Sequence, residues 1–261
     1  MELIILKIGG SIITYKDRSK PEVNFKNLRK IINELIGIKK KLILIHGVGS
    51  FGHQIVKKTG IDKGIKTKND SVNFAETQRL QNKLNCIVTE ELIKKGLPAF
   101  PFQASSSAIM KNGRLIKMDL DVIKGLIKLG VIPVLYGVPA YDKEKGCSIL
   151  SGDQIAPYLA KNLKIKRIIM AGDTDGVFTA NPKKDKNAKQ IKIISRKNFK
   201  EVKKMIEGSS FIDVTGGMAG KVVELINGAR EGISAQIING TKKNSIKNAL
   251  SGKTIGTIIK W

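Results

Sequence analysis

The sequence predicts an α/β protein with a mostly parallel central sheet, and two observations carry this prediction. Short apolar runs that suit buried strands alternate along the chain with segments of helical period. Several of these runs also end in turns that contain glycine or aspartate. Alternating strands and helices are typical of a parallel sheet covered by helices on both faces. Ligands of such sheets bind at the carboxyl ends of the strands, where these turns lie.

The expected elements follow one another without a clear linker or an internal repeat. The runs "LIILKI" (3–8) and "LILIH" (42–46) predict two strands, with an amphipathic helix from Phe25 to Leu35 between them. The later elements are a helix through Phe74, Leu80, Leu84, Ile87, Val88 and Leu92, a short extended piece at 97–102, a helix over 119–130, a strand at 131–137, a helix after Asp153, a strand at 167–172, a helix after Gly217 and a strand at 235–240. We expect one domain over 1–261 with two lobes, 1–150 and 151–261, that hold different ligands.

The composition indicates a globular protein of a reducing compartment. The chain has 261 residues, 41% of them hydrophobic, which is enough for a sizeable core. Its two cysteines, Cys86 and Cys147, are far apart and show neither a disulfide framework nor zinc-ligand spacing. No apolar stretch approaches the roughly 18 residues that span a bilayer, and Lys7 interrupts the N-terminal run where a signal peptide would be apolar. We expect a cytoplasmic protein without membrane contact and without metal ligands of its own.

The formal net charge of +25 makes nucleic acid the first partner to consider. The charge is spread along the chain, however, and its densest part, 181–204, carries no recognition helix, zinc finger or aromatic RNA-binding pattern. A solvated lysine-rich surface is the simpler interpretation, with attraction of a polyanionic ligand such as a nucleotide as the alternative. Nucleic acid is therefore not expected as a partner.

Glycine-bearing turns recur at the ends of the predicted elements. They are "KIGGS" (7–11), "HGVGSFGH" (46–53), "GDTDG" (172–176) and "ING" (238–240) after strands, and "SGD" (151–153) and "TGGM" (215–218) before helices. Glycine lets consecutive N–H groups point the same way, and a helix N-terminus adds partial positive charge. One such turn can be an ordinary tight turn, whereas several at one edge of a sheet favour a ligand with several phosphates.

Two familiar nucleotide-binding patterns do not account for these turns. The run "GVGSFG" matches G-x-G-x-x-G, but no acidic residue at the end of a following strand is available to bind a ribose. The pattern G-x-x-x-x-G-K-[ST] is absent, as are the protein kinase signatures. Phosphoryl transfer needs mainly positive charge and an acceptor held in line, and Lys7, Lys16 and Lys221 are candidates for that charge. Lys7 stands out, because a lysine within a buried strand is unfavourable unless it faces an anion.

The motifs "LKIGGSIIT", "HGVGSFGH", "SGDQIAPYLA", "GDTDGVFTANP" and "DVTGGMAGKV" together resemble those of the amino acid kinase superfamily over essentially the whole chain. The ending "GSFGH" and the stretch "IDVTGGMAGKV" are most similar to the isopentenyl phosphate kinase family. This resemblance implies a three-layer αβα sandwich, commonly a homodimer. It also implies transfer of the γ-phosphoryl group of ATP, with Mg²⁺, to isopentenyl phosphate, which yields isopentenyl diphosphate on an alternative mevalonate route to isoprenoids.

The resemblance also implies roles for individual residues. On the ATP side, for which lobe 151–261 is expected, Asp173 and Gly217 would lie beside the nucleotide and Lys221 would contact the β- and γ-phosphates. Residues of the first lobe would also contact the ATP phosphates, namely Lys7, Gly9, Gly10, Ser11 and Gly49. Lys16 would stabilise the transition state. Asp153 would order the catalytic lysines through a salt bridge, and we also expect it to cap the helix that it opens.

On the acceptor side, lobe 1–150, the backbone around Val48 would hold the substrate phosphate together with Gly152, and His53 would donate a hydrogen bond to it. The alternative for His53 is a helix cap, and His46 is expected to be structural. The apolar tail of the acceptor needs a surface near His53, for which the candidates are Phe51, Ile55 and the helix that bears Phe74, Leu80 and Leu84, without a choice among their side chains.

Three positions depart from the family pattern and keep the choice of substrate open. Val48 replaces the middle residue of a three-glycine run, Val138 stands where relatives often have aspartate, and Gln154 stands where a second acid is common. The alternatives are a kinase of the same fold for another small phosphate, phosphonate or carboxylate, as in fosfomycin-type or amino acid kinases, and an inactive nucleotide-binding regulator. A regulator would have no use for a histidine on the acceptor side, which favours an enzyme.

Overall fold

The structure, a computed structural model, describes residues 1–182, 184–208 and 217–261. Its strands are β1 (Leu3–Ile8), β2 (Lys41–His46), β3 (Ala99–Pro101), β4 (Ala108–Lys111), β5 (Arg114–Met118), β6 (Ile132–Tyr136), β7 (Val138–Asp142), β8 (Gly146–Leu150), β9 (Arg167–Gly172), β10 (Val177–Phe178), β11 (Gln190–Ile191), β12 (Ile193–Ile194), β13 (Ser234–Asn239) and β14 (Thr257–Ile259). Its helices are α1 (Gly10–Ile13), α2 (Phe25–Asn33), α3 (Ser50–Thr59), α4 (Lys68–Ile93), α5 (Asp121–Lys128), α6 (Gly152–Asn162), α7 (Phe199–Gly208), α8 (Gly217–Arg230) and α9 (Ser245–Leu250), with 3₁₀ turns at Ile61–Lys63 and Ala104–Ser106.

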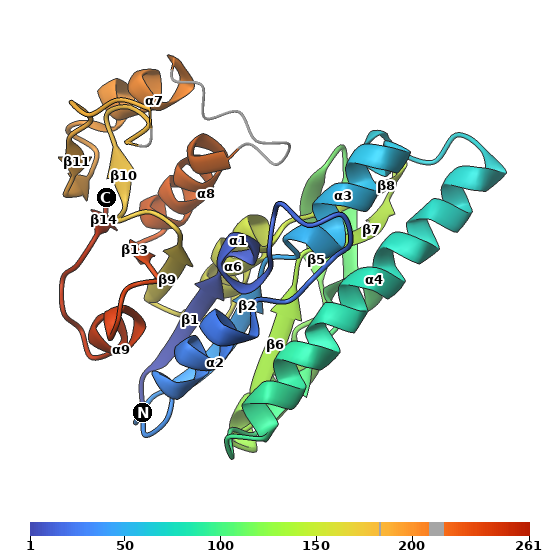
Figure 1. The fold of residues 1–261 in the computed structure, drawn as a ribbon, viewed down its shortest axis with the longest axis horizontal. Coiled ribbons are helices and arrows are strands. Elements are labelled where there is room, and N and C mark those ends of the chain that lie inside the picture. The colour runs from blue at the N-terminus through green and yellow to red at the C-terminus, as the bar shows by residue number, and fades with distance from the viewer. Residues whose placement is uncertain (183, 209–216) are drawn as a thin grey trace.

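The central sheet has eight strands in the order β12-β14-β13-β9-β1-β2-β6-β3 (Figure 1). Every neighbouring pair in it is parallel except β13 and β14, which are antiparallel. The strands β1, β2 and β9 lie side by side at its centre, so the turns that follow them meet at one edge. The predicted α/β class with a mostly parallel sheet is therefore confirmed.

Helices cover both faces of the sheet and make the three layers (Figure 1). The side chains of β1 alternate between these faces because successive residues of a strand point in opposite directions. Ile4, Leu6 and Ile8 pack with apolar residues of α2, α4 and α9. Ile5 packs on the other face, with apolar residues of α5, α6 and α8. The same alternation turns Lys7 toward α6 and α8.

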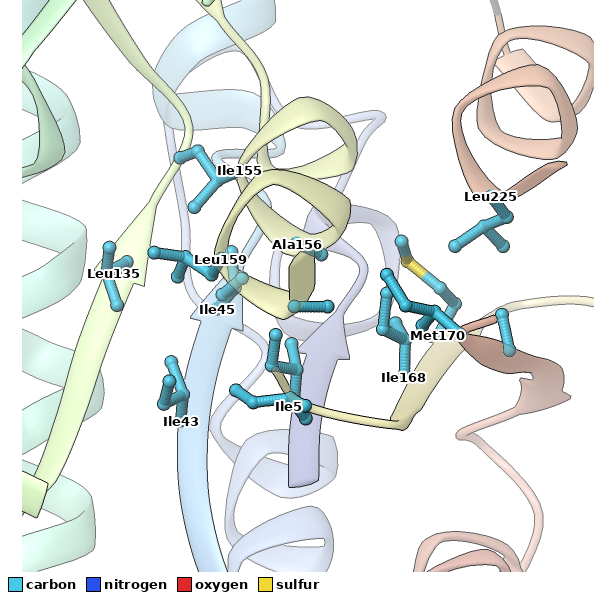
Figure 2. Close-up of a cluster of buried hydrophobic side chains, with 14 of the residues drawn as sticks. Ile5, Ile43, Ile45, Leu135, Ile155, Ala156, Leu159, Ile168, Met170 and Leu225 are labelled. Carbon is cyan, nitrogen blue, oxygen red and sulfur yellow. The ribbon is translucent and has the colours of Figure 1, made fainter. Parts of the chain in front are cut away.

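The core between the sheet and α6 is aliphatic and fully enclosed. Figure 2 shows Ile5, Ile43 and Ile45 of the central strands beneath Ile155 and Leu159 of α6, and all five side chains have no exposed surface. Burying a side chain of this size contributes about 1.5–3 kcal/mol relative to leaving it exposed. This packing holds the first turn of α6 over the carboxyl end of β1, next to the glycine turn at residues 7–11.

Two smaller sheets were not predicted from the sequence. One contains four strands in the order β5-β4-β7-β8, and the other pairs β10 with β11. Asp142 at the end of β7 connects parts of the first, since its carboxylate accepts from the N–H groups of Asn112, Gly113, Glu144 and Lys145 and from the hydroxyl of Ser148. Its short strands carry no long apolar period, which is why the sequence pattern did not reveal them.

Candidate active site

A cavity of about 580 Å³ lies at the carboxyl ends of β1, β2 and β9. The helices α1, α3, α6 and α8 begin at residues that border it, namely Gly10, Ser50, Gly152 and Gly217. The first N–H groups of a helix have no partner within the helix, and they carry the positive end of its dipole. Several helix N-termini around one cavity favour an anionic ligand with more than one phosphate.

Two glycine turns touch through their backbones at the floor of the cavity. A Cβ atom on Gly10 would lie 2.2 Å from the backbone nitrogen of Gly49, and one on Gly47 would lie 2.5 Å from the nitrogen of Gly10. Gly49 also has a positive φ of 48°, which side chains disfavour. The turns after β1 and β2 therefore need glycine because of their close approach, and this approach brings the starts of α1 and α3 together.

Lys7, Asp153 and Lys221 form a buried ion cluster on the inner side of the cavity. The Nζ atom of Lys7 lies 2.9 Å from Oδ1 of Asp153, and Nζ of Lys221 lies 3.1 Å from Oδ2. The three side chains are 9%, 15% and 18% exposed, respectively. One carboxylate thus holds two ammonium groups, which leaves a net positive charge facing the cavity.

Burial and pairing act in opposite directions on the pKa values in this cluster. Burial lowers the pKa of Lys7, and the neighbouring Asp153 carboxylate offsets part of that effect. Burial would raise the pKa of Asp153, but the ammonium groups of Lys7 and Lys221 outweigh it and hold that pKa below its ordinary value. Asp153 is therefore ionised at neutral pH and already engaged by two cations.

Lys16 and Asp173 face the same cavity from its solvent side. The Nζ atom of Lys16 lies 3.9 Å from Oδ2 of Asp173, and these side chains are 59% and 36% exposed. Lys16 belongs to the loop after α1, and Asp173 follows β9 directly. A cation on an exposed loop can move toward a ligand, whereas the buried cluster is fixed by the core.

The two histidines of the turn after β2 have different surroundings. His46 is completely buried, stacks on Tyr136, and contacts the Gly47 carbonyl through Nδ1 at 3.0 Å and Nδ2 of Asn85 through Nε2 at 3.1 Å. A carbonyl can only accept and an amide nitrogen can only donate, so Nδ1 carries the hydrogen, Nε2 accepts from Asn85, and the ring is neutral. Burial lowers the pKa of His46 to about 4. His53, one turn into α3, lines the cavity instead, so only this histidine is placed to meet a ligand.

The residues to which the sequence analysis gave catalytic, ATP-binding or phosphate-binding roles all border this one cavity. They are Lys7, Gly9, Gly10, Ser11, Lys16, Val48, Gly49, His53, Gly152, Asp153, Asp173, Gly217 and Lys221. Their individual roles stay predictions, since the geometry shows where they lie and not what they bind. Thr215 and Gly216 of the predicted "TGGM" turn lie outside the described residues.

One detailed expectation was wrong. Asp153 does not cap α6, because Ser151 is the N-cap residue and its hydroxyl accepts from the N–H of Gln154 at 3.3 Å. A serine immediately before a predicted helix is itself a capping signal, which the sequence analysis overlooked. The candidate tail-binding side chains Phe51, Ile55, Phe74, Leu80 and Leu84 border neither this cavity nor a second, smaller one beside it, although Gln81 of the same helix, α4, lines the smaller one. The surface that binds the tail stays a prediction. Phe51 and Leu84 belong to the core on the α2, α4 and α9 face.

The three departures from the family pattern have structural explanations. Among the described residues, positive φ outside glycine occurs at Asn112, Lys164 and Asn244, so Val48 keeps a backbone suited to a β-branched side chain. Val138 is fully buried in the core. Gln154 accepts from the N–H of Leu115 at 3.1 Å and donates to the carbonyl of Gly113 at 3.0 Å. A carboxylate could not make the second of these bonds.

Other residues that line the cavity were not assigned a role from the sequence. Ser151, Thr174, Asn181 and Met218 also border the cavity; they lie within the quoted motifs, but the sequence analysis gave them no individual role. Within residues 1–182, 184–208 and 217–261, no three or more His, Cys, Asp or Glu side chains are arranged to hold a metal ion. None of the helices in these ranges is long and apolar enough to cross a bilayer.

The chain belongs to the amino acid kinase family, whose sequence profile matches residues 2–239. It is 35% identical to an isopentenyl phosphate kinase of Methanothermobacter thermautotrophicus over 97% of each chain. A solved isopentenyl phosphate kinase superposes with a TM-score of 0.87 at 33% identity, covering 99% of this chain and all of the other. The product complex of the Thermoplasma acidophilum isopentenyl phosphate kinase superposes with a TM-score of 0.81 at 26% identity, again covering 99% of this chain and all of the other.

Proposed function

We propose that this protein transfers the γ-phosphoryl group of ATP to isopentenyl phosphate and so makes isopentenyl diphosphate. The observation that carries the proposal is a single cavity bordered on one side by the Lys7, Asp153 and Lys221 cluster and on another by His53. Such a cavity has cations for the group that moves and a separate hydrogen-bond donor for the phosphate that receives it. The similarity to isopentenyl phosphate kinases over the whole chain supports this choice of acceptor.

The arrangement suits phosphoryl transfer between two phosphates. The second pKa of a phosphate monoester is about 6, so the acceptor oxygen is largely deprotonated at neutral pH and needs no general base. The main obstacle is the repulsion between two anionic molecules, which fixed cations and N–H dipoles offset. Asp153 is ionised and paired with two lysines, so its role is to position them.

The two ligands divide the cavity between them. Gly9, Gly10, Ser11 and Gly49 would contact the phosphates of ATP together with Lys7 and Lys221, and Asp173 and Gly217 would lie beside the nucleotide. Val48 and Gly152 would hold the acceptor phosphate through their backbones, with His53 as its side-chain donor. Lobe 1–150 would thus supply most of the acceptor side and lobe 151–261 most of the ATP side, with Lys16 reaching over the transferred group.

Other properties of the protein are proposed on the same basis. Mg²⁺ usually binds phosphate oxygens and keeps several waters, so it would enter with ATP and neutralise the phosphates there. This fits a site in which the described residues offer lysines and N–H groups to the phosphates and no cluster of metal ligands. A homodimer in the cytoplasm, acting in isoprenoid biosynthesis, completes the proposal.

The choice of acceptor is tested by measuring ADP formation with several acceptors. Isopentenyl phosphate, fosfomycin, UMP and glutamate are offered separately with ATP and Mg²⁺. We expect the highest kcat/KM with isopentenyl phosphate, because His53 and the N–H groups around Val48 suit a small phosphate monoester. A best rate with UMP or glutamate would overturn the proposed acceptor, and no ADP with any of them would favour an inactive regulator.

His53→Ala tests the acceptor side by itself. We expect kcat with isopentenyl phosphate to fall by about 100-fold or more, since one preorganised donor to a developing charge contributes on this scale. The affinity for ATP, measured by calorimetry, should not change. Lys57→Ala is the matched control, because Lys57 is exposed in the same helix and borders neither cavity. Unchanged turnover in His53→Ala would show that this histidine does not serve the acceptor.

A further inference from the structure

An ion pair outside the cavity joins a β-hairpin to the helix that carries Lys221. The guanidinium group of Arg114, the first residue of β5, donates from both terminal nitrogens to the carboxylate of Glu224 in α8, with Nη2 at 3.0 Å from Oε2. Neither residue borders the large cavity or the smaller one. Because arginine and carboxylate are paired at two points, their orientation is fixed as well as their separation.

Arg114 is presented by a tightly held hairpin. The turn between β4 and β5 is Asn112-Gly113, and both residues have positive φ, 53° and 79°. Two consecutive residues of this conformation are typical of the type I′ turn, for which Asn-Gly is a preferred sequence. The buried carboxylate of Asp142 accepts from both N–H groups of the turn, at 3.1 and 2.7 Å. The backbone just before Arg114 is therefore fixed against β7.

The same hairpin is fastened to α6. Gln154 accepts from the N–H of Leu115 at 3.1 Å and donates to the carbonyl of Gly113 at 3.0 Å, so its amide bonds the residues on either side of Arg114. Gln154 directly follows Asp153 in α6, and the Asp153 carboxylate pairs with Lys221 at 3.1 Å. The hairpin and the partner of Lys221 are thus held by adjacent residues of one helix.

Glu224 lies three residues after Lys221, so the two side chains are neighbours on the surface of α8, one turn apart. The helix is held at both places, by Asp153 at Lys221 and by Arg114 at Glu224. One ion pair would still let the helix rotate about that contact, whereas two restrict its rotation and its shift along the axis. Arg114 is 57% exposed, and a pair with so exposed a partner contributes little to stability. Its geometry is therefore the property to explain.

We infer that Arg114 and Glu224 are positioning residues that set the place of Lys221 for phosphoryl transfer, an inference that rests on the proposed function. In this transfer the bond between the γ-phosphorus and the bridging oxygen of ATP breaks, and ADP leaves with the electron pair of that bond. A new bond forms between the γ-phosphorus and an oxygen of the acceptor phosphate. Negative charge thus grows on the β-phosphate, which Lys221 would contact, and a displaced ammonium group stabilises that charge less.

Glu224→Gln tests the pair, since it keeps the shape of the side chain and removes its charge. We expect kcat with ATP and isopentenyl phosphate to fall by about tenfold or more, because small displacements in a catalytic site have effects of this size. The KM for isopentenyl phosphate and the midpoint of urea denaturation should match those of the control, Glu231→Gln. Glu231 follows α8 directly and pairs with Lys161 of α6 at 2.7 Å, at the end of the helix opposite Lys221. The control should keep the kcat of the wild type.

A double-mutant cycle shows whether the effect passes through Lys221. In the Lys221→Ala background, Glu224→Gln should change kcat by less than about twofold, because the group that it positions is gone. A contact that merely supports the fold would lower kcat by the same factor with and without Lys221. Arg114→Gln should reproduce the loss seen in Glu224→Gln, and the double variant of the pair should lose no more than either single variant.

The possible results separate the inference from the proposed function. A kcat of Glu224→Gln equal to that of Glu231→Gln, or an equal loss with and without Lys221, would overturn the inference and leave the pair as a surface contact. If Glu224→Gln does not fold, Arg114→Gln, whose side chain is mostly exposed, takes its place in the cycle. If the wild type forms no ADP with any acceptor, the proposed function fails. The cycle is then measured in the dissociation constant of ATP by calorimetry, where coupling to Lys221 supports the positioning role and additive effects overturn it.

Discussion

The inner wall and the outer rim of the large cavity hold the same kinds of charge in different surroundings. The inner wall, defined as Lys7, Asp153 and Lys221, is at most 18% exposed and has ion-pair distances of 2.9 and 3.1 Å. The outer rim, defined as Lys16 and Asp173, has one pair at 3.9 Å with side chains 59% and 36% exposed. The fold therefore fixes the charges of the inner wall before any ligand binds. The charges of the outer rim are more exposed to solvent and can change position when a ligand binds.

This difference predicts separate consequences for stability and for catalysis. Removing one partner of a buried ion pair costs about 3–5 kcal/mol, because the other partner stays buried without its counter-charge. An exposed pair contributes about 0.2–1 kcal/mol. Changes in the inner wall should therefore affect both folding and activity, and changes in the rim should affect activity alone.

Asp153→Asn should have the largest effect, since it leaves two buried ammonium groups without a carboxylate. We expect the free energy of unfolding to fall by about 3–5 kcal/mol, with loss of turnover. Urea denaturation followed by circular dichroism measures the first quantity and ADP release the second. ATP should recover part of the lost stability by replacing the missing negative charge. A change in unfolding free energy below about 0.5 kcal/mol would contradict the view that the fold holds these charges.

His46, buried next to the inner wall, should make the protein sensitive to acid. Its pKa is about 4 in the folded chain, against an ordinary value of 6.5. The unfolded chain therefore binds the extra proton more readily between these values, and stability that is complete above about pH 6.5 is lost as the pH falls toward 4, by about 3 kcal/mol in total.

Proton NMR of the two imidazole rings measures this titration directly. The chain has only two histidines, so the His53→Gln spectrum identifies the signal of His46, which should titrate near pH 4. The acid-dependent loss of stability should persist in His53→Gln. If it disappears there, the loss belongs to His53 and the burial argument for His46 is wrong.

Lys16→Ala tests the rim. We expect kcat to fall by about 100-fold, because a cation that meets the transferred group stabilises the transition state more than the ground state. The free energy of unfolding should change by less than about 1 kcal/mol, since the side chain is mostly exposed. A loss seen only in ATP affinity, with kcat intact, would assign Lys16 to nucleotide binding instead.

Asp173→Asn should have the smallest effect on stability. It removes the partner of Lys16 at the rim, and we expect a change of less than about 1 kcal/mol in the free energy of unfolding. The free energies of unfolding of Asp173→Asn and Asp153→Asn are measured under identical denaturant conditions, so that the rim and the wall are compared in one experiment. Equal destabilisation by the two substitutions would show that the inner wall does not depend on its ion pairs more than the outer rim does.

Much of the fold could be predicted from the sequence, because apolar runs, helical periods and glycine turns are local patterns. Strand β1 was visible as an apolar run, and the position of Lys7 within that run predicted a lysine that faces an anion. The glycines at positions 9, 10 and 49 marked turns of unusual backbone. The paired short strands around Asp142 were not visible, since Asp142 joins segments near 112 and 148 that have no common pattern.

The candidate site was partly predictable for the same reason. Residues next to glycine turns were found, because those turns necessarily meet where parallel strands end. The burial of Gln81 beside the smaller cavity was not predicted, because a glutamine within a long helix is usually exposed and nothing in its spacing marks it as buried. Of the apolar residues considered for the tail pocket, Phe51 and Leu84 pack into the core, because the helical period does not determine which neighbouring element a helix face contacts.

By itself the sequence determined the alternation of the main strands and helices, the turns that need glycine, and the charges available near them, because these depend on backbone preferences and side-chain periods over a few residues. Only the tertiary structure decided that Asp153 pairs with both Lys7 and Lys221, and that His46 is completely buried while His53 lines the large cavity. These outcomes depend on desolvation and on contacts between segments far apart in the chain, which no local pattern encodes.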